Sequence, residues 1–151
     1  MSYANCCQPY HTGNAIPQTA EALMRSRYAA YVLQNIDYIV TTTVPAQQPL
    51  LDRQAVTDWA KQTDWAGLEI INHMPKLGKR HASVEFKAFF NTPDGMQAHH
   101  ELSAFVKVHD NKSGIVRWYF IDPTVSMLVT QKQPCICGSG EKFKRCCGQF
   151  L

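Results

Sequence analysis

Cysteine is absent from most of this sequence. Residues 8–134 contain none, and the six cysteines of the 151-residue chain lie in its first seven and last seventeen positions. So few cysteines exclude a small protein held together by many disulfides. Their placement confines any cysteine chemistry to the two ends of the chain.

Long apolar runs and targeting signals are also missing. No window approaches 18 consecutive apolar residues, so the sequence predicts no transmembrane helix and no membrane partner. The first residues, MSYANCCQPYHTG, have no basic start, apolar core or cleavage site of a secretory signal. We therefore expect a cytoplasmic protein, and in that compartment closely spaced cysteines are more often metal ligands or redox groups than disulfides.

Strong charge of one sign is likewise absent. The chain has 15 Lys+Arg and 12 Asp+Glu, a formal net charge of +3, which gives no reason to expect sequence-specific binding of nucleic acid. There is no Gly-rich phosphate loop and no Ser/His/Asp catalytic signature. Hydrophobic residues at 45% and charged residues at 18% indicate a globular protein rather than a disordered chain.

The first half of the chain has helical periodicity. After the expected N-cap Thr19, apolar residues recur every three or four positions as far as Val40, which predicts one amphipathic helix of about six turns. A second, shorter helix is expected after Asp52, the residue placed to cap it.

The second half alternates between apolar and polar residues. This pattern predicts strands at 68–74, 81–90, 99–109 and 115–121, joined by short turns. Helices first and strands afterwards indicate an α+β fold, in which one strongly curved antiparallel sheet is wrapped by the N-terminal helices. Along the third strand, we expect the apolar side to be the buried one, and it consists of Leu102, Ala104, Val106 and Val108.

The tail contains the pattern C-x-C-x8-C-C, formed by Cys135, Cys137, Cys146 and Cys147. Two close pairs of thiolates separated by one short loop suit a closed tetrahedral zinc site. Disulfides and idle thiols are the alternatives, although a disulfide between adjacent cysteines closes a strained ring. Zinc is favoured over iron because the loop is short and compact, while the ligand type alone leaves iron open.

The loop between the cysteine pairs carries further signals. Gly138 and Gly140 are expected to relieve the backbone restraints of a tight wrap, because they lack a Cβ. Phe143, its one large apolar side chain, is expected to pack against the rest of the protein. The polar stretch 130–133 precedes the tail, so we place a domain boundary near residue 130.

Residues 134–148, PCICGSGEKFKRCCG, resemble the SEC-C motif, the zinc-binding module at the C-terminus of the preprotein translocase SecA. In that motif the last ligand is often His rather than Cys. The resemblance implies that all four cysteines of the tail bind one structural Zn²⁺ per chain, in a module spanning residues 131–151. In SecA-like proteins the module meets a chaperone or the ribosome, so the resemblance also implies a protein or ribonucleoprotein partner.

The N-terminus resembles half of a second such motif. MSYANCC aligns with EKFKRCC at residues 141–147, aromatic over aromatic and cysteine pair over cysteine pair, so residues 1–14 look like a remnant. Cys6 and Cys7 cannot form a four-cysteine site alone, and we expect a shortened or misassigned start rather than a second metal site. The alternatives are two orphan thiols, recruitment of His11 as an extra ligand, or a metal shared between chains.

The chain as a whole resembles the uncharacterised bacterial YchJ-like proteins. The resemblance rests on PYHTG at 9–13, TAEALMRSRY at 19–28, HELSAF at 100–105 and the Trp118-Tyr119 strand. It implies that residues 15–130 have the cone-shaped α+β fold of the nuclear transport factor 2 superfamily, in agreement with the periodicity. Members of this superfamily often dimerise through the open sheet face, so a homodimer is one expectation.

Few residues outside the tail stand out. Asp37 and Glu101 could face a central cavity as acid or base, although a solvated or salt-bridged carboxylate is the favoured interpretation. Arg25 or Arg27 is expected to cover the sheet edge and pair with an acid such as Glu101. Histidines are expected at the surface, and the tryptophans are expected in the core or lining a cavity: Trp59, Trp65 and Trp118.

Three functions fit these features. The favoured one is a non-enzymatic binding protein, whose tail (residues 131–151) carries four basic residues against one acidic residue, a local formal charge of +3. The alternative is a hydrolase, isomerase or dehydratase that acts on a small apolar substrate in the central cavity. A third interpretation, thiol redox chemistry or metal delivery, requires a labile metal.

Overall fold

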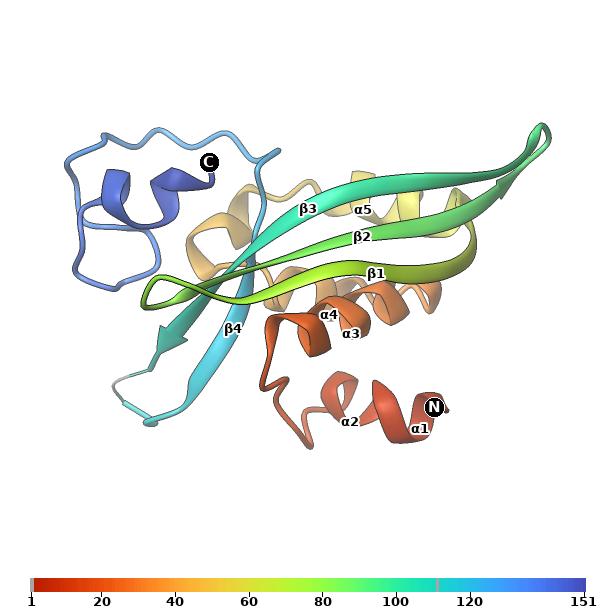
Figure 1. Ribbon diagram of the computed structural model, residues 1–151, viewed down its shortest axis with the longest axis horizontal. Helices are drawn as coiled ribbons and strands as arrows, with labels where there is room; N and C mark the ends of the chain where they lie inside the picture. Colours follow the sequence, from red (N-terminus) through yellow and green to blue (C-terminus); the bar gives the residue numbers. More distant parts are fainter. Residues whose placement is uncertain (1, 111) are drawn as a thin grey trace.

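The structure is a computed structural model that describes residues 2–110 and 112–151. A curved sheet runs through the molecule, with α3 and α4 along one side and the C-terminal tail on the other side, near the end where β1 turns into β2 (Figure 1). The strands are β1 (Asp64–Leu77), β2 (His81–Thr92), β3 (Gly95–His109) and β4 (Val116–Ile121), in the sheet order β1-β2-β3-β4 with antiparallel neighbours throughout. This arrangement confirms the predicted α+β fold with an antiparallel meander.

In the part of the chain that the structure describes, eight helices complete the fold. Six precede the sheet or lie at its start: α1 (Tyr3–Cys6), α2 (Gln8–His11), α3 (Ala20–Val32), α4 (Ile36–Thr41), the 3-10 helix η1 (Pro45–Leu50) and α5 (Arg53–Gln62). Two 3-10 helices lie in the tail: η2 (Phe143–Arg145) and η3 (Cys147–Gln149). Within the described residues, no helix is long and apolar enough to cross a membrane.

The predicted six-turn helix is wrong, because the chain forms two helices there. Helix α3 ends at Val32, Gln34 adopts a positive φ of 58°, and the Asn35 side chain accepts a hydrogen bond from Tyr38 N to begin α4. Asn35 N donates to Ala30 O at 2.8 Å, the bond that closes a left-handed helix end. The apolar periodicity continues across the break because both helices bury their inner faces in the same domain.

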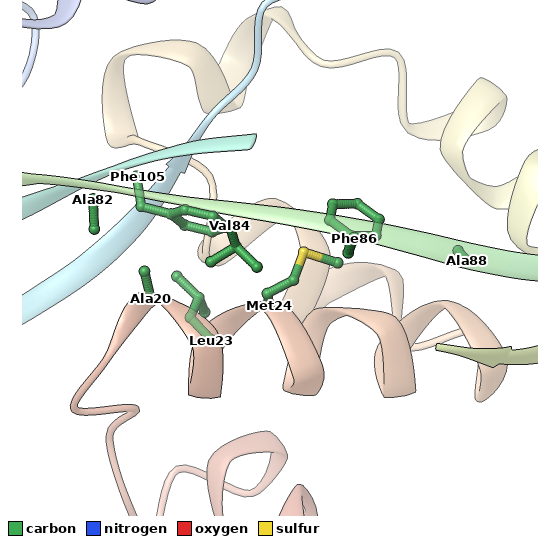
Figure 2. Close-up of a cluster of buried hydrophobic side chains, with 8 residues drawn as sticks. All are labelled: Ala20, Leu23, Met24, Ala82, Val84, Phe86, Ala88 and Phe105. Carbon is green, nitrogen blue, oxygen red and sulfur yellow. The ribbon is translucent and has the colours of Figure 1, made fainter. Parts of the chain in front are cut away.

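Helix α3 packs on the inner face of the sheet. Thr19 caps it by accepting from Ala22 N at 3.0 Å, as predicted. Small side chains let the helix approach the central strands closely. Figure 2 shows the resulting core, in which α3 side chains point at those of β2 and β3: Ala20, Leu23 and Met24 against Ala82, Val84, Phe86, Ala88 and Phe105.

The outer face of the sheet is buried at one end only. Phe105 points to the helices and is buried by them. Val106 points to the opposite face and is buried there because the tail packs against it. The prediction that Leu102 is buried is wrong, since this residue is 68% exposed beyond the reach of the tail. Alternation identified two faces correctly but could not tell which stretch of each face is covered.

The two edges of the sheet differ. Along β4, the segment after α4 forms a short parallel bridge, in which Phe120 N donates to Thr42 O at 2.8 Å and Val44 N to Phe120 O at 2.9 Å. Along β1, the pairing register shifts three times, at Trp65/Gly67, Ile70/Asn72 and Met74/Leu77. The first shift explains why β1 begins at Asp64 rather than at the predicted residue 68, because a bulge interrupts the alternation.

Candidate metal centre

The tail folds around its own cysteines through a few backbone hydrogen bonds. Cys135 N donates to Glu141 O at 2.8 Å, and Phe143 N donates to Gln133 O at 2.8 Å, which brings the two ends of the loop together. The loop reverses direction at Gly138 and Gly140, whose φ angles of 80° and 86° are left-handed as predicted. The second cysteine pair therefore returns to face the first.

The four sulfur atoms form one cluster. Their Sγ atoms all lie within 4.8 Å of one another, and all four side chains are buried: Cys135, Cys137, Cys146 and Cys147. Sulfurs at the corners of a tetrahedron around Zn²⁺ lie about 3.8 Å apart, because each Zn–S bond is about 2.3 Å. The Cys137 and Cys146 sulfurs are 3.5 Å apart, and none of the six cysteines forms a disulfide. The arrangement can hold one metal ion.

Hydrogen bonds within the cluster favour a thiolate at one position. Bonds from Cys135 and Cys147 lower the pKa of Cys137 well below that of a free thiol, although burial opposes the shift. The same interactions raise the pKa of Cys147 and raise that of Cys135 to about 11. A bound cation removes this competition, because metal ligation requires all four sulfurs to be deprotonated.

The 3-10 helices of the tail place the second pair. Gly148 follows the pair at a point where a Cβ atom would lie 2.5 Å from Phe143 O, so only glycine fits there. Cys147 N also points at Cys135 Sγ at 3.4 Å, an N–H···S contact that favours a charged sulfur. The close approach at Gly148 thus fixes the position of the second cysteine pair, and the N–H···S contact stabilises negative charge on the Cys135 sulfur.

The module sits on the outer face of the sheet. Phe143 is buried among Val44, Val106 and Ile121, which confirms its predicted packing against the rest of the protein. The turn between β1 and β2 supplies a basic side chain, since Arg80 Nη1 lies 3.9 Å from Cys146 Sγ.

His81 is the residue that sequence analysis missed. Its Nε2 lies 3.6 Å from Cys147 Sγ and 3.8 Å from Cys146 Sγ, and its ring contacts that of Phe150 at 4.8 Å. The expectation of a surface histidine is therefore wrong here, because His81 opens β2 directly beneath the module and is buried. Burial lowers its pKa, so the neutral ring can donate one N–H toward the sulfurs.

The N-terminal cysteine pair has no such surroundings. Cys6 and Cys7 lie with their sulfurs 3.2 Å apart, and within the described residues they belong to no group of three or more possible metal ligands. His11 is occupied elsewhere, since its Nδ1 bonds the Tyr3 hydroxyl and its Nε2 bonds Ser26 O. The alternative of His11 as an extra metal ligand is therefore not supported by the geometry.

The carboxylates considered for catalysis lie apart. Asp37 is exposed and pairs with Arg53, outside the central cavity. Glu101 does line that cavity, and its Oε2 lies 3.2 Å from His99 Nε2. Neither candidate arginine forms an ion pair with Glu101: Arg25 pairs with Glu21, and Arg27 is buried against the end of α4.

The tryptophans divide between two places. Trp59 and Trp65 line the cavity, with ring centroids 5.4 Å apart. Trp118 lies outside it, and its Nε1 donates to Gln18 O at 3.2 Å.

Family models match both parts of the chain. Residues 19–123 match the model described as "YchJ, middle NTF2-like domain", and residues 132–149 match the SEC-C motif. A UPF0225 protein of Actinobacillus succinogenes is 54% identical over 151 residues, 100% of this chain and 94% of that protein. A UPF0225 protein of Haemophilus influenzae is 57% identical over 149 residues, 99% of this chain and 88% of that protein.

Solved structures show the same fold. The crystal structure of a SEC-C motif containing protein from Psychrobacter arcticus has a TM-score of 0.98 and 64% identity, covering 100% of this chain and 88% of its own. The solution structure of a SEC-C motif containing protein from Rhodopseudomonas palustris has a TM-score of 0.70 and 35% identity, covering 83% of this chain and 93% of its own. The chain therefore belongs to the UPF0225 family of YchJ-like proteins, with an NTF2-like middle domain and a C-terminal SEC-C motif.

Proposed function

We propose that this chain is a non-enzymatic binding protein whose SEC-C module holds one structural Zn²⁺ and docks an anionic surface of a protein or ribonucleoprotein. The observation that carries the proposal is the cluster of four buried sulfurs within 4.8 Å of one another. Its ligands are Cys135, Cys137, Cys146 and Cys147.

The size of the cluster favours a single ion. An iron–sulfur cluster distributes its cysteines over several metal atoms, whereas sulfurs this close together fit around one tetrahedral centre. Arg80 and His81 place positive charge and an N–H group beside the sulfurs, which offsets the charge of −2 that four thiolates and one Zn²⁺ carry together. A closed set of four protein ligands leaves no open position, as in structural rather than catalytic zinc sites.

Metal analysis of the purified full-length chain tests the zinc site. We expect one equivalent of zinc per chain by inductively coupled plasma mass spectrometry, and no more than traces of iron. Two equivalents of zinc per chain would contradict the conclusion that Cys6 and Cys7 do not bind a metal. One equivalent of iron, or no metal in protein purified without chelators, would overturn the proposal.

The surface around the module is suited to an anionic partner. Four basic side chains of the tail are exposed, and a hollow of about 500 Å³ at the junction with the sheet is lined by Lys79, Arg80 and Arg145 among others. The basic residues of the tail are Lys132, Lys142, Lys144 and Arg145. Their charge steers and orients an acidic partner without sequence-specific contacts.

Charge reversal on the module tests the docking. Lys142→Glu/Lys144→Glu changes two exposed residues that do not contribute to the core, and Lys61→Glu/Lys112→Glu is the matched control elsewhere on the surface. With full-length baits of equal zinc content, we expect the control to retain the partners of the wild-type chain and the module variant to lose them. Identical partner sets for all three baits would overturn the docking role.

The candidate acids of the enzymatic alternative differ in their position. That alternative needs an acid or base in the cavity, and Asp37 lies outside it. Glu101 and His99 line the cavity and pair with each other at 3.2 Å, so this pair is the acid–base candidate on which the enzymatic alternative rests.

A further inference from the structure

The central cavity has two chemically different ends. It has a volume of about 190 Å³ and lies between α3, α5 and the inner face of the sheet. Along β3, His99 pairs with Ala88 and Ser103 with Val84, so these two lining residues lie about 13 Å apart along the strand. Aromatic rings surround the His99 end, and polar groups surround the Ser103 end.

The aromatic end is a box of flat rings. Tyr31 and Trp59 have ring centroids 5.1 Å apart, Trp59 and Trp65 5.4 Å, and Trp59 and His99 5.6 Å, in edge-to-face arrangements. Such walls bind a flat apolar body, because they offer a large contact area with little loss of side-chain freedom.

The polar end contains a buried guanidinium with unused donors. Arg27 is 4% exposed and lies with its Cζ 4.4 Å from the centroid of Phe120. All of its hydrogen bonds within the described residues use Nη1, which donates to Ile39 O at 2.9 Å and to two threonine hydroxyls. Its Nε and Nη2 have no hydrogen-bond partner there, yet the protein does not enclose either atom completely. Because Arg27 lines the cavity, this edge of the guanidinium opens into it.

No carboxylate neutralises Arg27 directly. Among the described residues, no acidic oxygen lies within 4.0 Å of its nitrogens. The nearby acids are engaged elsewhere: Glu101 with His99, and Asp122 Oδ1 with the backbone N–H and hydroxyl of Thr124 at 2.9 and 2.6 Å. Burial lowers the pKa of Arg27, since the charge loses its hydration without gaining an ion pair.

We propose that the cavity binds a small carboxylic acid with a flat aromatic or unsaturated body. The carboxylate pairs with the Nε/Nη2 edge of Arg27, which presents two parallel N–H groups and matches both carboxylate oxygens. Ser103, which is 3% exposed and without a hydrogen bond within the described residues, offers its hydroxyl as a third donor. The body of the ligand lies among Tyr31, Trp59 and Trp65. This site is on the opposite face of the sheet from the metal module and does not depend on it.

Binding of three probes with the same shape and different charge shows which charge the cavity prefers. Cinnamate, cinnamamide and cinnamylamine share the same flat body and differ only in the terminal group. Titration of the full-length chain is followed by the indole N–H signals in proton–nitrogen correlation spectra. Trp59 and Trp65 report on the cavity, and Trp118, whose Nε1 is bonded to Gln18 O outside it, is an internal control. We expect cinnamate to shift the two cavity signals with at least tenfold higher affinity than either uncharged or cationic probe.

Variants then locate the carboxylate. Arg27→Gln is expected to weaken cinnamate binding at least tenfold and to abolish its advantage over cinnamamide, while Arg53→Gln on the surface changes neither. If Arg27→Gln does not fold, Ser103→Ala serves instead and is expected to lower cinnamate affinity several-fold. Tighter binding of cinnamylamine, equal binding of all three probes, or no shift of the Trp59 and Trp65 signals would overturn the proposal.

Discussion

The two adjacent cysteine pairs of this chain share a local sequence pattern but have different surroundings. Each pair follows an aromatic residue by three positions, Tyr3 before Cys6 and Phe143 before Cys146. The C-terminal pair faces two more cysteines on a short loop. At the N-terminus, the hydrogen bonds of the Cys7 sulfur within the described residues go to the sulfur of Cys6 and the carbonyl of Arg25, at 3.2 and 3.8 Å. An adjacent pair is thus half of a site, and its chemistry is decided by what the rest of the chain places opposite it.

Removing one sulfur from each pair gives the largest expected contrast. Cys146→Ser should lose nearly all bound metal and more than about 3 kcal/mol of unfolding free energy, because metal binding supplies the folding energy of such modules. Cys7→Ser should keep the metal and lose about 1 kcal/mol or less. Zinc content and denaturant unfolding measure both effects. Equal metal loss in the two variants would remove the distinction between the pairs.

Glycines near the two pairs sharpen the comparison. A Cβ at Gly148 would lie 2.5 Å from Phe143 O, so Gly148→Ala should cost about 2–3 kcal/mol and weaken metal binding. Gly13, with a φ of 82° but open space around it, should cost only about 1–2 kcal/mol of backbone strain when changed to Ala. Thermal unfolding of the zinc-loaded and chelator-treated proteins separates the two costs. A metal-independent effect of Gly148→Ala would contradict the role given to it.

Each pair also has a histidine nearby. His81→Phe keeps a ring beside Phe150 but removes the N–H next to the sulfurs, and we expect about a tenfold loss of zinc affinity. His11→Phe removes hydrogen bonds to Tyr3 and Ser26 and should leave zinc affinity unchanged. Competition with a chromophoric chelator gives both affinities. An unchanged affinity in His81→Phe would show that its contact with the sulfurs is packing alone.

The last expected effect, the pH dependence of Cys7, is absent at neutral pH. Burial raises the pKa of this thiol from 9.0 to about 12, so the folded state favours the protonated form. Its contribution to stability is complete well below pH 9 and is lost as the pH rises toward 12, with about 1.4 kcal/mol lost by pH 10. Cys7→Ala should flatten that part of the stability profile.

Alkylation provides an independent readout of the same shift. At pH 8, iodoacetamide should label Cys6 well before Cys7, as followed by peptide mass spectrometry. Rapid labelling of Cys7 at that pH would show that its thiol is not protected.

The cysteine module was predictable because its ligands and turn residues lie within thirteen consecutive positions. Spacing alone brings Cys135 and Cys147 together, and left-handed glycines between them mark the turns. His81 could not be found in this way, because it precedes Cys135 by more than fifty positions. It lies beside the cluster only because β2 pairs with β3, the strand on which the tail packs. A histidine at the start of a strand gives no local signal of what will cover it.

The helical region shows the complementary limit. Apolar periodicity identified the buried positions of α3 and α4, yet it continued smoothly through the turn at Gln34 and Asn35. Hydrophobic spacing reports which side chains are buried, whereas a helix end depends on the backbone and its caps. The unpaired edge of Arg27 was equally hidden, because a lone arginine among apolar residues has the same sequence pattern whether its charge is paired or not.

The edges of the sheet limit how copies of this protein can associate. The outer edge of β4 is already bonded to the segment around Thr43, and the three register shifts of β1 disrupt the straight ladder that a further strand would need. Growth of the sheet by strand addition, the usual start of ordered aggregates, is therefore obstructed on both sides. A homodimer of the kind that the resemblance suggests would have to form face to face, over the uncovered stretch near Leu102.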